Sequence, residues 1–83
     1  MPIRRDAADT QRQERWAVTR ARVGSNVRRL RLEADLTQEA LALESGLSRN
    51  HLIELEHGRR GVLFERLKDL AVALGVPAST LLD

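Results

Sequence analysis

The sequence has no cysteine and only two aromatic residues, Trp16 and Phe64, in 83 positions. Without cysteine it can form neither a disulfide bond nor a thiolate metal site, and we expect a cytoplasmic protein. Proteins that bind single-stranded nucleic acid usually stack bases on several aromatic side chains, so the shortage of aromatics argues against that class. No apolar run approaches the length that crosses a bilayer, and we expect no interaction with a membrane.

Residues that could perform catalysis or bind a metal ion are also scarce. The two histidines, His51 and His57, are six positions apart and do not share a face of a helix. A zinc site needs about three or four convergent ligands, and no pattern in the sequence supplies them. Ser45 and Ser48 have no nucleophile–base arrangement, and no glycine-rich phosphate loop is present. We therefore expect no enzyme activity, no metal and no cofactor.

What is present predicts one small all-α domain. Hydrophobic residues make up 42% of the chain, enough for a globular fold. Apolar spacing predicts a helix that ends near Ala34 and another from Leu63 or Phe64 to Leu74, terminated by Gly75. Pro77 suits the first position of a short last helix. The residues expected to face inward from the helix before Gly75 are Leu67, Leu70, Ala71 and Leu74.

The most informative segment, residues 37–58, predicts two short helices joined by a tight turn. Thr37 is a good N-cap for the first helix, and Ser48 caps the second. Gly46 can adopt the left-handed conformation that a helix end requires. Ala42 is small where the two helices cross, and Leu47 is the apolar residue of the turn. Such a pair of helices can place the second in the major groove of duplex DNA.

The second of these helices has one apolar face and one polar face. Leu52 and Leu55 define the buried side at 100° per residue. Arg49, in the first turn, can still reach toward a base edge. Arginine, asparagine, glutamate and an aliphatic side chain match guanine, adenine, cytosine and the thymine methyl group. The residues that project from the opposite side are Asn50, Ile53, Glu54 and His57.

This pattern resembles the phage repressor and Cro type of helix-turn-helix, the XRE family. The resemblance covers roughly residues 23–83 and implies a five-helix lambda-repressor-like domain. The loop after Gly58 departs from the family pattern, because it reads Gly61-Val62-Leu63 where a proline and a serine are common. The motif residues that carry the resemblance are Gln38, Ala42, Gly46, Leu47, Leu52, Leu55 and Glu56-His57-Gly58.

The resemblance also implies roles for individual residues. Arg49, Asn50 and Glu54 match base-contacting positions, and the face analysis adds Ile53. Arg31 and Glu56 match a pair that often joins the first and third helices. Gln38 matches a glutamine that touches phosphate and braces the base-contacting helix. The candidate contacts to the DNA backbone are Thr37, Gln38, His57, Arg59, Arg60 and Arg28.

The charge distribution places the phosphate attraction outside the motif. Residues 35–57 contain one arginine and five acidic residues, whereas residues 1–22 contain six arginines and three acidic residues. We expect Arg28, Arg59, Arg60 and some N-terminal arginines to attract phosphate. The alternative for each N-terminal arginine is an ordinary solvated charge.

Residues 1–22 precede the resemblance as a partly helical extension to the domain at residues 23–83. We expect the helix to begin near Thr10, and it either runs through Gly24 or breaks at Gly24-Ser25. Trp16 lies on the same helical face as Val23, so it could pad the core or form a dimer contact. We favour these two roles over a basic arm along DNA, because burying a tryptophan removes a large apolar area from water.

The sequence thus predicts a duplex-DNA-binding transcriptional regulator, a repressor or controller protein without a small-molecule ligand domain. One such domain contacts too few bases for useful specificity, so we expect a homodimer on a two-fold-related operator. The alternative is a protein-interaction module, such as an antitoxin, that binds its partner protein through residues 1–22.

Overall fold

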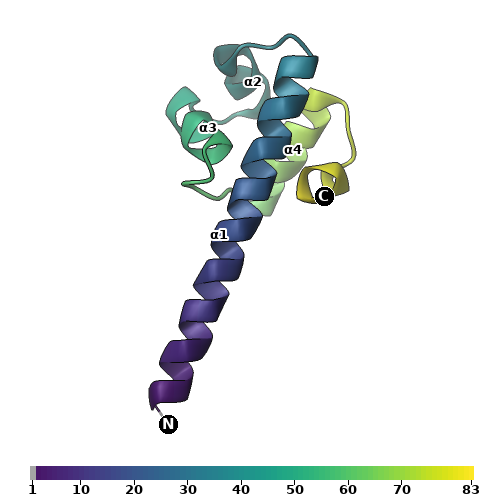
Figure 1. Ribbon diagram of the computed structural model, residues 1–83. Coiled ribbons are helices and arrows are strands. Elements are labelled where there is room, and N and C mark those ends of the chain that lie inside the picture. Colours follow the sequence, from purple (N-terminus) through teal and green to yellow (C-terminus); the bar gives the residue numbers. More distant parts are fainter. Residues whose placement is uncertain (1) are drawn as a thin grey trace.

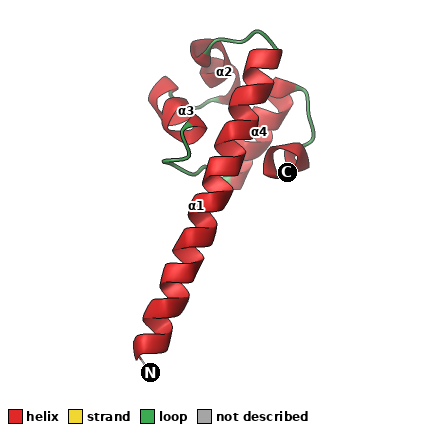
Figure 2. Cartoon of the chain, viewed as in Figure 1, coloured by secondary structure: helices red, strands yellow, loops and turns green. Residues whose placement is uncertain are grey.

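The computed structural model describes residues 2–83, with side chains from residue 7 onward. Within that range the fold is all-α, as predicted, with four α-helices and a short 3₁₀-helix (Figures 1 and 2). The predicted count of five α-helices is not confirmed, because the last element has five residues and forms the tighter helix typical of short pieces. The elements are α1 (Pro2–Glu33), α2 (Gln38–Ser45), α3 (Arg49–Glu56), α4 (Phe64–Leu74) and η1 (Ala78–Leu82).

The first helix is one continuous rod that does not break at Gly24-Ser25. Gly24 is buried where α1 crosses α3, and a Cβ at this position would overlap the carbonyl oxygen of Leu55. Glycine costs a helix interior about 1 kcal/mol relative to alanine. Here that cost is offset by the close approach of two helices, which only a residue without a side chain permits.

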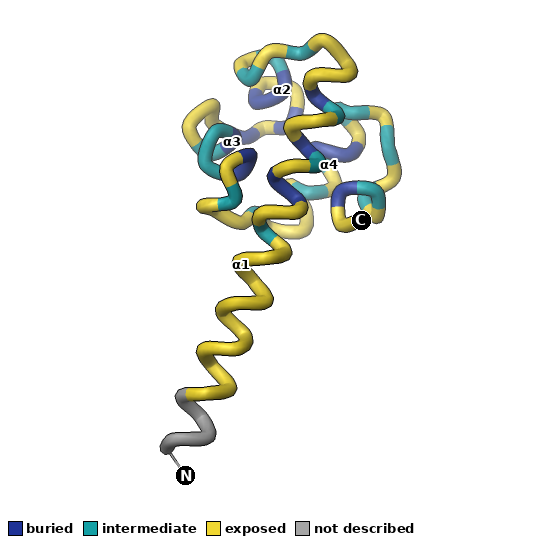
Figure 3. The backbone as a smooth tube through the Cα atoms, viewed as in Figure 1, coloured by how far each residue is buried: buried dark blue, intermediate teal, exposed yellow. Residues whose placement is uncertain are grey.

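The core lies where the C-terminal half of α1 meets α2, α3, α4 and η1 (Figure 3). From α4, Leu70 and Ala71 are buried and Leu67 and Leu74 are partly buried, as predicted. Gly75 ends α4 in the left-handed conformation, at φ 71°. The side chains with less than 2% of their surface exposed include Leu41, Leu52, Leu55, Leu70, Leu81 and Val27.

The N-terminal part of α1 projects from the globular part of the chain (Figure 1). Residues 7–19 are all exposed, and from residue 7 onward Val23 is the first buried residue of the helix. Trp16 is 53% exposed, so the predicted padding of the core by this side chain is wrong. Trp16 does share a face with Val23, but it lies in the part of α1 that projects from the globular part of the chain. The division of the chain at residue 22 stays a prediction, since α1 runs through that point.

None of the helices in residues 2–83 combines the length and the apolar character needed to span a bilayer.

Candidate nucleic-acid interface

The turn between α2 and α3 is held by the residues that the sequence singled out. The hydroxyl of Thr37 accepts a hydrogen bond from the backbone amide of Ala40 at 3.0 Å. The hydroxyl of Ser48 accepts one from the backbone amide of His51, also at 3.0 Å. Gly46 has φ 77°, in the left-handed region. Both helices therefore begin with a satisfied N-cap and meet at a glycine, which fixes the direction in which α3 leaves the turn.

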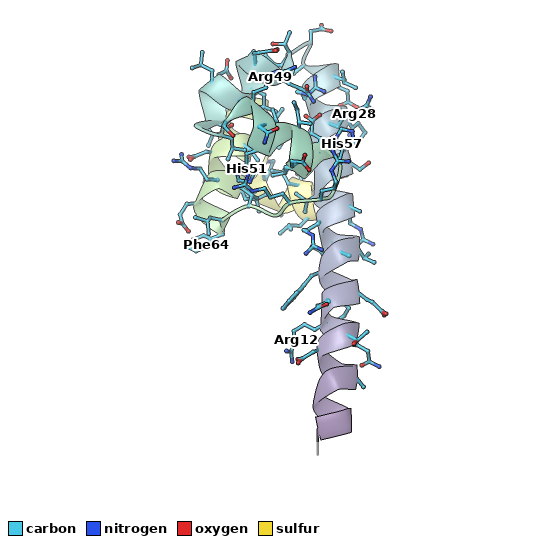
Figure 4. All side chains as sticks on the ribbon, turned by 90° about the vertical axis from the view of Figure 1, so that its left-hand side faces the viewer. Arg12, Arg28, Arg49, His51, His57 and Phe64 are labelled. Atoms are coloured by element: carbon cyan, nitrogen blue, oxygen red, sulfur yellow. The ribbon has the colours of Figure 1, made fainter. Side chains whose placement is uncertain are left out.

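Helix α3 has the two faces that its sequence predicts. Leu52 and Leu55 are buried in the core, with 0% and 1% of their surface exposed. On the other side Asn50 is exposed, and Ile53 and Glu54 are partly exposed. Figure 4 looks onto the side of the molecule where α3 lies at the surface. The base-contacting candidates therefore sit on a helix whose opposite face is anchored.

A buried ion pair holds α3 against α1. Arg31 donates from Nε to Oε2 of Glu56 at 2.6 Å and from Nη2 to Oε1 at 3.0 Å. The side chain of Gln38 donates to the same carboxylate at 3.2 Å, and Arg31 also donates from Nη1 to the carbonyl of Leu36 at 2.9 Å. The hydrogen bond to Glu56 raises the pKa of Arg31 above its ordinary value. The Glu56 carboxylate of α3 thus ties α1 and α2 to that helix.

Arg49 forms an ion pair with a residue of the preceding helix. Its Nε lies 2.7 Å from Oε1 of Glu39, and more than half of each side chain is exposed. The pKa of Glu39 is lowered, first by a hydrogen bond from its own backbone amide and then by the charge of Arg49. Sequence reasoning missed this partner, because Glu39 and Arg49 approach each other only once the turn has folded.

A second ion pair crosses the C-terminal end of α3. Arg59 donates from Nε to Oε2 of Glu54 at 2.7 Å, and this hydrogen bond lowers the pKa of Glu54. Glu54 and Arg59 were predicted to contact different parts of DNA, and the structure brings them into direct contact. The two charges that the sequence placed on the surface of α3 and the next loop therefore neutralise each other.

Two other candidate cations have no ion pair within residues 7–83. Arg28 and Arg60 are exposed and form no salt bridge with any residue from 7 to 83. Figure 4 labels Arg28 on α1 and His57 at the C-terminal end of α3. Unpaired guanidinium groups at the edge of such a surface are available to phosphate oxygens.

Each histidine side chain forms a hydrogen bond with a backbone carbonyl. Since a carbonyl oxygen only accepts, His57 donates from Nδ1 to Ile53 at 2.8 Å, and His51 donates from Nε2 to Gly61 at 2.9 Å. His51 thus ties α3 to the loop before α4. No group of three or more His, Asp or Glu residues within residues 7–83 could hold a metal ion.

The fold and this surface define a helix-turn-helix protein: a capped helix pair whose second helix has one buried face and one polar, exposed face. A helix-turn-helix family model matches residues 27–81. The chain therefore belongs to this family of DNA-binding transcriptional regulators, which confirms the XRE-type resemblance.

Curated relatives and solved structures agree with this membership. The uncharacterised HTH-type transcriptional regulator y4dJ of Sinorhizobium fredii is 52% identical over 54 residues, which cover 65% of this chain and 70% of that protein. The control protein C.BamHI of Bacillus amyloliquefaciens is 38% identical over 61 residues, 72% of this chain and 75% of that protein. The restriction-modification controller protein C.AhdI of Aeromonas hydrophila, which has a crystal structure, is 35% identical in sequence to this chain. It matches with a TM-score of 0.72 over 75% of this chain and 94% of that chain.

Proposed function

We propose that the protein binds duplex DNA as a homodimer, with α3 of each copy in the major groove of one half of a two-fold-related operator. The observation that carries this proposal is the exposed face of α3, which presents Asn50 and Ile53 while Leu52 and Leu55 anchor the opposite side. Arg49 joins these residues at the start of the helix. Half-site centres are expected about one DNA turn apart, roughly 34–36 Å.

Contacts to the DNA backbone are proposed at both edges of this surface. Arg28 and Arg60 are exposed cations without an ion pair in residues 7–83, and Arg59 keeps part of its guanidinium free. The N-terminal half of α2 contributes Thr37 and Gln38. His57, at the C-terminal end of α3, completes the set. These contacts would supply the attraction that the acidic motif lacks.

We propose that binding represses or controls a promoter by occupying it, without catalysis and in the cytoplasm. The relatives named control or controller proteins support this role, since the match covers 75% of C.BamHI and 94% of the C.AhdI chain. Selection of bound sequences from random duplex DNA tests the proposal. A symmetric, enriched motif with two half-sites is expected, and recovery of unrelated sequences would contradict it.

The projecting part of α1 supports a second candidate function, binding of a partner protein through residues 1–22. A quarter of this chain lies outside the match to C.AhdI, although almost all of that chain is matched. The full-length protein and a variant that lacks residues 1–22 should be compared in operator binding and in retention of a partner. Loss of the partner with unchanged operator binding would favour the second function.

The same part of α1 could instead contribute to the dimer. Trp16 is the large apolar side chain that α1 exposes there, together with Val18. Sedimentation of Trp16→Ala distinguishes the two roles, because a dimer contact predicts weaker self-association. An unchanged dimer affinity would exclude Trp16 from the dimer interface.

A further inference from the structure

Glu54 and Arg59 are joined twice across the end of α3. The backbone amide of Arg59 donates to the carbonyl oxygen of Glu54 at 3.0 Å, and the side-chain Nε donates to the Glu54 carboxylate at 2.7 Å. Gly58 lies between them with φ 72° and turns the chain back over the last turn of α3. A Cβ on Gly58 would also come within 2.9 Å of the Cα of Ala21 in α1. The backbone thus places Arg59 beside Glu54, and the ion pair fixes the direction of its guanidinium.

The ion pair leaves most of the guanidinium unused. Only Nε of Arg59 donates to Glu54, and neither terminal nitrogen has a hydrogen bond to any residue from 7 to 83. The Arg59 side chain is 58% exposed, whereas that of Glu54 is 33% exposed. The carboxylate is therefore the more enclosed partner, and the free donors form the fork that matches the oxygens of a phosphate.

A role for Glu54 in contacting a base conflicts with this arrangement. A carboxylate that accepts from a cytosine amino group has to turn toward the base, which weakens its hold on Arg59. An unpaired carboxylate at this position would also repel the phosphates on either side of the groove. Paired with Arg59, the same carboxylate adds no net charge to the surface.

We infer that Glu54 is a positioning residue, which holds the Arg59 guanidinium toward the phosphate backbone and does not itself contact a base. This inference rests on the proposed function, since it requires duplex DNA against α3. Arg59 then makes a contact that does not depend on the DNA sequence, and Glu54 affects DNA affinity only through Arg59.

The test compares Glu54→Ala with Glu54→Gln in the full-length protein. Glutamine keeps an oxygen that can accept from Arg59 Nε, whereas alanine does not. We expect the DNA affinity of Glu54→Ala to be lower than that of Glu54→Gln by about threefold or more. The difference should be the same on the selected operator and on random duplex. The slope of log affinity against log salt should fall by about one in Glu54→Ala only. In an Arg59→Ala background the difference between the two Glu54 variants should disappear.

The exposed pair of Arg29 and Glu33 near the end of α1, 3.4 Å apart, provides the matched control. Glu33→Ala and Glu33→Gln should bind DNA equally, and circular dichroism should show unchanged helical content in every variant. Equal affinities of the two Glu54 variants would overturn the inference, and so would a loss confined to one base position, which would assign Glu54 a base contact. If the unmodified protein bound no duplex DNA, the proposed function itself would fail, and the inference with it.

Discussion

Arg31 of α1 and Glu56 of α3 form a two-point ion pair that is almost wholly removed from solvent. The side chains are 9% and 1% exposed, and Gln38 and the carbonyl of Leu36 satisfy their remaining hydrogen-bonding groups. No buried side-chain nitrogen or oxygen in residues 7–83 lacks a hydrogen-bond partner. The pair links α1 to α3 at two points, and it thereby holds α3 in a fixed orientation on α1.

Glu56→Ala should destabilise the protein by about 3–5 kcal/mol, because it leaves the Arg31 charge buried without a partner. Urea unfolding followed by circular dichroism measures the free energy. Glu33→Ala removes the same charge from an exposed pair and should cost about 0–1 kcal/mol. A cost below about 1 kcal/mol for Glu56→Ala would mean that Arg31 reaches solvent once its partner is gone.

Gly24→Ala should destabilise the protein by about 1–3 kcal/mol, although alanine is the better helix former. The added Cβ overlaps the carbonyl of Leu55 and forces α1 and α3 apart. Ser25→Ala, at the exposed neighbouring position, should be neutral or slightly stabilising in the same urea titration. A stabilised Gly24→Ala variant would show that the two helices separate at little cost.

Asn50→Ala and Arg49→Ala should each weaken binding to the selected operator by about 1–3 kcal/mol and relax the preference at one base position. The reason is the loss of a side chain that matches one base edge. Fluorescence anisotropy on the operator and on single-base variants measures both effects. Equal losses on random duplex would instead place these residues on the backbone.

Arg60→Ala should weaken binding to every sequence alike and reduce the salt slope by about one, because it removes one phosphate contact. Affinities across a series of salt concentrations provide the slope. Lys68→Ala removes an exposed positive charge from α4, which contributes no residue to the proposed surface, and should leave the slope unchanged. A loss on the operator alone would contradict a backbone contact by Arg60.

The pKa of the Glu54 carboxyl, lowered by the hydrogen bond from Arg59, should rise toward its ordinary value in Arg59→Ala. A lowered carboxyl pKa contributes stability above the ordinary glutamate pKa, and that contribution is lost as the pH falls through the lowered value. Carbon-detected NMR titration of the side chain reports the pKa directly. The same pKa in both proteins would mean that the pair is not formed in solution.

Much of the helix-turn-helix could be predicted because its determinants are local. Thr37, Gly46 and Ser48 act through hydrogen bonds and backbone angles within a few residues of themselves, so their roles do not depend on the rest of the fold. The inward face of α3 followed from the spacing of Leu52 and Leu55. The tighter form of η1 could not be predicted, since Pro77 and a short apolar segment fit an α-turn and a 3₁₀-turn equally.

The sequence by itself determined the caps of α2 and α3 and the two faces of α3, because these depend on side-chain type and short spacings. Only the tertiary structure decided which charges meet. Glu54 and Arg59 are brought together by the left-handed Gly58, and Arg49 meets Glu39 through the angle between α2 and α3. It also decided the place of Trp16, which shares the face of Val23 but lies beyond the point where α1 leaves the other helices. Periodicity defines the face of a helix, and only packing defines how far along the helix that face is covered.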